Sequence, residues 1–526
     1  MSPSLFVRGA SIWTGDERKP RAEALWVEDG VFQAVGGEAY VESLCPKGAR
    51  RVDAGGGLVV PGMTDAHIHL TAYCKQSLYL DLSGVRSLEG LLETLSKYIE
   101  KERGCRWIRA VNYNETTWDR PVSLTGELID SVGRGRPVLL SRYDGHVHVA
   151  NGRAMEETAL RESFDPNVER DADGRPTGVL REGAASSILT RIEDEYESGE
   201  RIRELLADGC RRLASWGITA VHACDAPSYG LPEDIAALQD LREAGELPLR
   251  VISYHDAFPN LNFRSFLGDD HICYGGLKIF LDGSLGGHSA ALREGYSDQP
   301  SVRGQLCHSD RELMEMLAEA QARKIQVQMH MIGDASIDQA IRVSKELLER
   351  TGKAPAYPLR FNHVIVSHPE QLDAMKSLGV VVDLQPIQAF TDREMAPERL
   401  GKKRMEGTYP FRRLYDAGLL VTGSSDAPIE HPNPWLGIWA AVCGTDEQGR
   451  PLRESKMDEV LTLEEALALY TRNPYRALRW NGGFGTIAEG APADFAILEE
   501  NPFEMDVQRL KKLRVKETYL AGTKTY

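Results

Sequence analysis

Residues 60–69, which read VPGMTDAHIH, place two histidines two positions apart at the end of a run of β-forming residues. Side chains two apart on a strand point to the same face of a sheet, so His67 and His69 are expected to converge. Such a pair is half of a metal site, because Zn²⁺ and similar ions bind neutral imidazole nitrogens. A histidine pair also occurs by chance, so its meaning depends on the strands that accompany it.

Apolar runs rich in β-formers recur along the middle of the chain, and each ends in a polar or ionisable residue. Helical sequence lies between most of them, for example ELMEMLAEAQARK and SIDQAIRVSKELLER. Eight strands with intervening helices predict a (β/α)8 barrel, which carries its catalytic residues at the C-terminal strand ends. An open doubly wound sheet is the alternative, but the GxGxxG turn that would support it does not follow the first strand. The eight runs are 58–69, 218–225, 249–255, 276–282, 325–330, 359–364, 380–385 and 419–426.

Both ends of the chain read as short strands and turns with little helical periodicity. Neither end is long enough to form a stable sheet domain alone, so residues 1–57 and 484–526 are expected to form one small β-sandwich. The barrel would then comprise residues 58–75 and 206–483. The interval between the first two barrel strands is far longer than one loop and helix. Residues 76–205 are therefore expected to be an inserted lid that covers the barrel mouth.

The 526-residue chain has 62 basic and 78 acidic residues, which give a formal net charge of −16. This acidic balance argues against nucleic acid and anionic membranes as partners, since no basic stripe stands out to meet phosphates. No run approaches the roughly 18 apolar residues of a membrane span, and the N-terminus lacks a signal-peptide pattern. The eight cysteines stand singly, which indicates reduced thiols in a cytoplasmic protein. Any bound metal would therefore be held by histidines and carboxylates.

Further ligand-type residues end other predicted strands: Lys278 in GGLKIFLDGSLGG, His330 in QVQMHMIGDAS, His363 in RFNHVIVSH and Asp426 in TGSSDAPIEHP. With the histidine pair on strand one, they fall on strands four, five, six and eight. This ordered set resembles the amidohydrolase superfamily over nearly the whole chain. The phrases LDGSLGG, MHMIGDAS and TGSSDAPIEHPNP narrow the resemblance to the YtcJ-like branch, which includes N-substituted formamide deformylase. The phrases WIRAVNYNETTWD, DGHVHVAN and DGRPTGVLRE in the insertion resemble the same branch.

The resemblance implies one or two divalent metal ions, with Zn²⁺ as the expected ion. It implies that His67 and His69 hold the more buried ion and that His330 and His363 hold the second. These ligand types suit a catalytic zinc site, which leaves one position open for water.

Lys278 is chemically unusual as a ligand, because an ammonium group cannot bind a cation. The resemblance implies that this lysine carries CO₂ as a carbamate, N6-carboxylysine, which would bridge the two ions. Glu182, in GVLREG, is the alternative bridging ligand. An ion pair with Asp282 would be an alternative role for Lys278.

The resemblance to the amidohydrolase superfamily implies that Asp426 contacts one metal ion and transfers a proton during the reaction. A bound metal lowers the pKa of water so that hydroxide exists near neutral pH and can attack a carbonyl carbon. Asp426 would take the proton from water and pass it to the departing nitrogen, first as general base and then as general acid. The alternative role for Asp426 is the N-cap of a helix that begins near Pro434.

Two positions depart from the family pattern. Relatives usually read Arg-Ile-Glu-His at the sixth strand, whereas this chain reads RFNH, with Asn362 in place of the glutamate. That change removes one negative charge beside the metal site. His288 stands where relatives more often carry Ser-Arg or Thr-Arg. The candidate substrate contacts are Tyr113, Trp118, His146, Asp282, His288 and Asn362.

The sequence thus predicts a metal-dependent hydrolase that cleaves a C–N bond in a small molecule. The expected substrate is an N-substituted amide, a formamide or a cyclic amide. An esterase or lactonase, a deaminase or a decarboxylase could use the same site. A non-catalytic scaffold on the same fold is the alternative of a different class. Because relatives are commonly oligomeric, a homodimer is expected.

Overall fold

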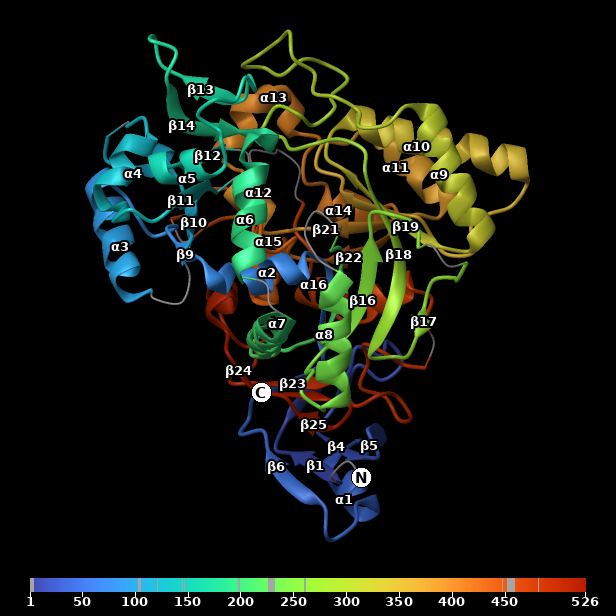
Figure 1. Ribbon diagram of the computed structural model, residues 1–526. Helices are drawn as coiled ribbons and strands as arrows, with labels where there is room; N and C mark the ends of the chain where they lie inside the picture. The colour runs from blue at the N-terminus through green and yellow to red at the C-terminus, as the bar shows by residue number, and fades with distance from the viewer. Residues whose placement is uncertain are drawn as a thin grey trace. The chain divides into compact units, whose positions relative to one another are not determined.

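A computed structural model describes residues 4–102, 106–120, 122–143, 145, 147–196, 199–225, 232–259, 262–446, 448–451, 459–480 and 482–526. The chain forms two compact units. Residues 1–72 and 207–526 form the first, here called the barrel unit, and residues 73–206 form the second, the inserted unit. Figure 1 traces both units and labels many of their elements.

Eight parallel strands of the barrel unit lie side by side in the order in which they occur in the sequence. They are β8 (Met63–Ile68), β15 (Ile218–Ala223), β16 (Arg250–His255), β18 (Ile272–Phe280), β19 (Gln326–Met331), β20 (Arg360–His363), β21 (Val381–Leu384) and β22 (Leu420–Gly423). Just beyond β22, the backbone N–H of Asp426 donates to the carbonyl of His67, at 2.8 Å. This bond brings the last strand back beside the first, so the predicted (β/α)8 barrel is confirmed.

Helices separate the barrel strands along the chain, as the sequence periodicity indicated. Helix α9 begins with a capping box in which Ser309 and Glu312 each satisfy a backbone N–H of the other. The helices of this part are α7 (Gly199–Ala214), α8 (Pro232–Glu243), α9 (Asp310–Arg323), α10 (Asp334–Thr351), α11 (Pro369–Leu378), α12 (Gln388–Thr391), α13 (Met395–Met405), α14 (Phe411–Asp416), α15 (Pro434–Val442), α16 (Leu463–Leu469) and α17 (Arg472–Ala477).

The first predicted barrel run proves to be two strands with different partners. Strand β7 (Leu58–Pro61) pairs with β2 (Ser11–Trp13) and β23 (Phe495–Leu498), outside the barrel, and only β8 belongs to the barrel. Gly62 separates the two strands. A Cβ atom at this position would lie 2.1 Å from Thr219 Oγ1, so the close approach of β15 requires a glycine here.

Strands from both chain ends form two further sheets of the barrel unit. One sheet has the order β5-β4-β1-β6 and the other the order β25-β24-β23-β7-β2-β3. Their shared core includes Val7 and Phe32 from the N-terminal part and Phe495 and Tyr519 from the C-terminal part. The remaining strands are β1 (Leu5–Arg8), β3 (Arg21–Ala22), β4 (Ala24–Glu28), β5 (Val31–Gly36), β6 (Arg50–Asp53), β24 (Val515–Leu520) and β25 (Thr523–Lys524).

The inserted unit has its own sheet, with the strand order β13-β14-β12-β11-β10-β9. Helix α3 (Leu88–Lys101) contributes Leu91, Leu95 and Ile99 to a buried cluster with this sheet. The other elements are β9 (Leu80–Asp81), β10 (Ile108–Tyr113), β11 (Val138–Arg142), β12 (Val147–Ala150), β13 (Val168–Arg170), β14 (Pro176–Arg181), α4 (Gly126–Gly133), α5 (Gly152–Glu157) and α6 (Ser186–Tyr196).

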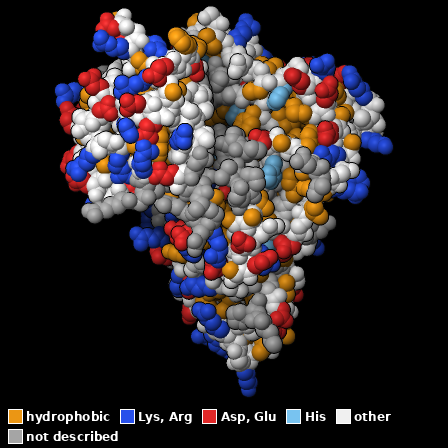
Figure 2. Space-filling model, in the orientation of Figure 1, with side chains coloured by type: hydrophobic (Ala, Val, Ile, Leu, Met, Phe, Trp, Pro, Cys, Tyr) orange, Lys and Arg blue, Asp and Glu red, His pale blue; other side chains and the backbone are white. Residues whose placement is uncertain are grey.

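Acidic and basic side chains are interspersed over the face of the molecule that Figure 2 draws. Within the described residues, no helix combines the length and the apolar composition needed to cross a bilayer.

The packing around Tyr470 makes a first prediction. Its ring lies between β22 and α15, where a Cβ atom on Gly437 would lie 1.9 Å from the tyrosine hydroxyl. The substitution Gly437→Ala is therefore expected to destabilise the barrel unit by about 1–3 kcal/mol, the usual cost of overpacking. The matched control is Gly48→Ala, since a Cβ there meets nothing within 4 Å. Thermal unfolding of the full chain should show a lower Tm for the first variant only, and equal Tm values would refute the packing argument.

Candidate metal centre

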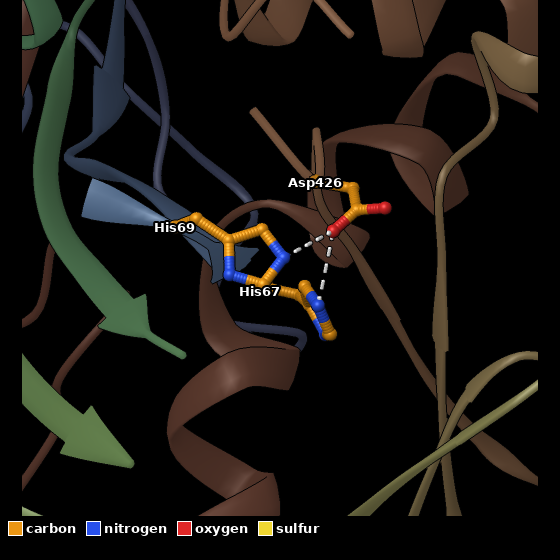
Figure 3. A group of neighbouring side chains, drawn as sticks. All are labelled: His67, His69 and Asp426. Carbon is orange, nitrogen blue, oxygen red and sulfur yellow. Dashed lines mark ion pairs between the residues drawn. The ribbon is translucent and has the colours of Figure 1, made fainter. Parts of the chain in front are cut away.

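Three buried side chains converge at the C-terminal end of the first and last barrel strands (Figure 3). His67 Nε2 lies 3.1 Å from Asp426 Oδ1, and His69 Nε2 lies 3.3 Å from the same oxygen. The two nitrogens and the carboxylate oxygen all lie within 4.8 Å of one another. His67 and His69 point to one face of the chain at the end of β8, as the sequence spacing indicated.

Two further histidines adjoin this group. The rings of His67 and His363 have centroids 5.3 Å apart, and those of His363 and His330 are 4.4 Å apart. Strands β19 and β20 are adjacent and parallel, which explains why their terminal histidines meet. Four imidazoles and one carboxylate thus gather at one end of the barrel, as expected for residues at the ends of parallel strands.

Hydrogen bonds fix which nitrogen of two rings faces the centre. His69 Nδ1 donates to the backbone carbonyl of Cys224 at 2.8 Å. His363 Nδ1 donates to Gln385 Oε1 at 2.8 Å, and the amide nitrogen of Gln385 is engaged with Ser424. In both histidines, Nε2 is therefore the unprotonated nitrogen that can ligate a cation. Such outer contacts orient the ligands of metal sites and set their tautomers.

Lys278 projects from β18 into the same centre and is 1% exposed. Its Nζ lies 3.1 Å from His67 Nε2 and donates to Asn362 Oδ1 at 2.8 Å. Among the described residues, no carboxylate forms an ion pair with this amine. Burial lowers the pKa of Lys278 below its ordinary value, since desolvation penalises the charged form.

The electrostatics keep the imidazoles of His67, His330 and His363 neutral and the carboxylate charged. Burial, followed by the charge of Lys278, lowers the pKa of His67 to about 3 and that of His330 to about 4. Burial would raise the pKa of Asp426, but the facing imidazoles, His67 first among them, hold it well below its usual range. Neutral imidazole and ionised carboxylate are the forms that bind Zn²⁺.

The residues present fit a divalent cation. Asp426 Oδ1 is buried and accepts no hydrogen bond from the described residues, although two imidazole nitrogens face it. His363 Nε2 is likewise buried without a hydrogen-bond partner in the described part of the chain. Buried polar atoms are rarely left in this state, and a cation among them would satisfy both.

The pKa values of these histidines make a second prediction. Histidines of ordinary pKa, about 6.5, would weaken zinc binding progressively as the pH falls below neutrality. Since the pKa values of His67 and His330 are about 3 and 4, their contribution to the zinc Kd is expected to stay constant down to about pH 5.5. Competition with a chromophoric chelator, corrected for the chelator's own protonation, measures this. A steep loss of affinity that begins near pH 6.5 would refute it.

Two alternative roles raised by the sequence are wrong. Asp282 does not pair with Lys278; its carboxylate accepts hydrogen bonds from the backbone of Ala291, Ile332 and Gly333 and from the Ser336 hydroxyl. Asp426 is not the cap of helix α15. Asn433 fills that position and accepts from the backbone N–H of Trp435.

The candidate substrate contacts have different environments. Asn362 is fully buried and bonds Lys278, whereas His288 pairs with Asp298 at 2.9 Å and packs its ring against Tyr296. Tyr113 and Trp118 belong to the apolar core of the inserted unit. His146 and the side chain of Glu182 lie outside the described residues.

Several positioning groups were missed by sequence reasoning. The Asp65 carboxylate accepts from the backbone N–H groups of His67 and Ser425 and from the Ser425 hydroxyl, which ties β8 to the segment after β22. Its position two residues before His67, on the same face, was an available signal. Gln385 ends a predicted strand and was also detectable in principle. The Cys224 carbonyl carries no such signal, because a backbone group is the same in every residue.

Comparison with known proteins agrees with this geometry. A family model described as the amidohydrolase family matches residues 50–526. The chain belongs to the amidohydrolase family. YtcJ of Bacillus subtilis strain 168, a family relative named as an amidohydrolase, is 30% identical over 98% of this chain and 98% of its own length. The N-substituted formamide deformylase of Arthrobacter pascens is 27% identical over 99% of this chain and 98% of its own length.

A solved structure also resembles this amidohydrolase chain closely. An uncharacterised metal-dependent hydrolase from Pyrococcus horikoshii OT3 superposes with a TM-score of 0.80 and 26% sequence identity. The match covers 96% of this chain and 99% of the other. The amidohydrolase fold therefore extends over almost the full length of both chains.

Proposed function

We propose that this protein is a zinc-dependent hydrolase that cleaves the C–N bond of an N-substituted amide, a formamide or a cyclic amide. The observation that carries the proposal is the convergence of His67 Nε2, His69 Nε2 and Asp426 Oδ1 within 4.8 Å at the C-terminal end of the barrel. Membership of the amidohydrolase family supports the reaction class. The likeness to a deformylase of N-substituted formamides supports the substrate class.

In this proposal, His67, His69 and Asp426 hold one ion, and His330 and His363 hold a second. Lys278, as its carbamate, would be a further ligand. A bound divalent cation polarises a carbonyl oxygen and lowers the pKa of water to near neutrality. Burial of the ligands excludes competing water and strengthens every charge interaction within the site.

Asp426 carries the proton. Its Oδ1 faces the two imidazole nitrogens, so Oδ2 is the atom that takes a proton from water and returns it to the departing nitrogen. An amine leaves poorly unless it is protonated, which makes this transfer most important for amides. The low pKa of the carboxyl keeps it ionised before each turnover.

A matched amide and ester pair tests the proposed reaction. The full-length protein is loaded with zinc and assayed with N-butylformamide and with butyl formate, following release of butylamine and butanol. Release of butylamine that stops after chelation and returns with zinc is the expected result. Hydrolysis of the ester alone would favour the esterase alternative. Bound zinc without turnover of any amide, lactam or ester would favour a non-catalytic scaffold.

A further inference from the structure

The Asn362 amide lies between Lys278 and a buried ion pair. Its Oδ1 accepts from Lys278 Nζ at 2.8 Å. On its other side, Nδ2 donates to Asp383 Oδ2 at 2.7 Å and to Gln328 Oε1 at 3.1 Å. Asn362, Asp383 and Gln328 are 0% exposed, so water does not compete for any of these bonds.

The orientation of this amide is set by the ion pair behind it. Asp383 is bound by the Arg360 guanidinium, and Arg360 Nη2 lies 2.8 Å from Asp383 Oδ1. An ionised carboxylate only accepts hydrogen bonds, so the amide NH₂ must face Asp383 and the amide oxygen must face Lys278. A glutamate at this position would set a second carboxylate against Asp383. Asparagine avoids that like-charge contact and still offers Lys278 an acceptor.

The Asn362 amide therefore fixes the position of the Lys278 amine. Lys278 Nζ reaches both Asn362 Oδ1 and His67 Nε2, which brings the amine into the ligand group. Gln328 is the register partner of Lys278 on the adjacent strand β19. Its Nε2 is buried and has no hydrogen-bond partner among the described residues, so it can donate to an oxygen on this wall of the barrel.

We propose that Asn362 is a positioning residue that holds Lys278 beside His67, where the lysine can become the bridging ligand. This inference rests on the proposed zinc-dependent function. The bridge forms when CO₂ reacts with the neutral amine. The Nζ lone pair forms a bond to the carbon of CO₂, the electron pair of one C–O π bond moves onto an oxygen to give the carbamate anion, and the proton lost from nitrogen passes to water.

A pair of isosteric substitutions separates this role from general support of the buried network. Asn362→Leu removes the contact to Lys278 and the donor to Asp383. Thr422→Val is the matched control, because the Thr422 hydroxyl also donates to Asp383, is also 0% exposed, and does not touch Lys278. Asn362→Ala, which adds no apolar atoms, is the second variant should the leucine variant fail to fold.

Three measurements on the full chain report the outcome: zinc affinity, the carbamate signal and the steady-state kinetics of amide hydrolysis. Zinc affinity is measured by chelator competition, and the carbamate is observed by carbon NMR after exchange with ¹³C-bicarbonate. Asn362→Leu is expected to weaken zinc binding about 10- to 100-fold, the range for lost outer contacts of metal ligands, and to abolish the carbamate signal. Thr422→Val is expected to keep both near the wild-type values, and kcat rather than KM should fall in the asparagine variants.

Retention of zinc affinity and of the carbamate signal in the asparagine variants would overturn the inference while leaving the proposed function intact. An equal loss in Thr422→Val would also overturn it, because the effect would then arise from Asp383. Failure of the wild-type protein to bind zinc would instead overturn the proposed function, and this inference with it.

Discussion

Replacement of Asp426 by asparagine is expected to lower kcat/KM for amide hydrolysis by about 10²- to 10⁴-fold, the usual contribution of a general acid–base group. Asparagine keeps the shape of the side chain and an oxygen that can face His67 and His69. It cannot take up a proton and return it to the leaving nitrogen. Because Asp426 is also a proposed zinc ligand, turnover is measured at saturating zinc with the bound zinc quantified, which separates lost proton transfer from weaker metal binding.

The control for this variant is Asp338→Asn, which makes the same chemical change in helix α10. Asp338 pairs with Arg293 at 2.6 Å and is not part of the metal centre. Its activity is expected to stay near that of the wild-type protein. Normal turnover in Asp426→Asn, with zinc still bound, would show that another group carries the proton.

The second large effect is expected in the barrel interior. Arg360 and Asp383 are fully buried, and the guanidinium also donates to His222 Nδ1 at 2.8 Å and to the Ala66 carbonyl at 2.8 Å. Arg360→Met would leave a buried carboxylate without its cation. The expected loss is about 3–5 kcal/mol in the free energy of unfolding, the usual cost of removing one partner of a buried ion pair.

The double variant Arg360→Met/Asp383→Leu should recover much of that loss, since apolar groups often replace a buried ion pair at little cost. Denaturant unfolding of both variants, followed by far-ultraviolet circular dichroism of the full chain, measures the difference between their free energies of unfolding. A loss below about 1 kcal/mol in the single variant would mean that water reaches Asp383 and that the pair is not desolvated.

Much of the fold could be predicted from sequence because the apolar runs and their polar ends are local signals. The eight runs correspond to β8, β15, β16, β18, β19, β20, β21 and β22, and the two β-rich chain ends share one core. The error at residues 58–61 has a physical reason. A continuous apolar run does not reveal where one strand changes partners, and the Pro61-Gly62 pair is the local mark of the break.

The candidate site was predictable only in part. Side chains two residues apart on a strand share a face, which predicted that His67 and His69 converge. The positions of Lys278, His330 and Asp426 near the ends of predicted barrel strands indicated that they belong to the same site. The partners of these residues depend on contacts between distant segments. Asp282 is bound by backbone N–H groups that follow β19, and no pattern around Asp282 itself indicates this.

We propose that the gathered histidines, with Asp426 and Lys278, form a catalytic metal centre. Elemental analysis of the full-length protein, compared with the double variant His67→Ala/His69→Ala, tests it most directly. Roughly one to two equivalents of zinc are expected in the wild-type protein after reconstitution, with a loss of at least one equivalent in the variant. Less than about a tenth of an equivalent in the wild-type protein, or equal zinc in both, would contradict it.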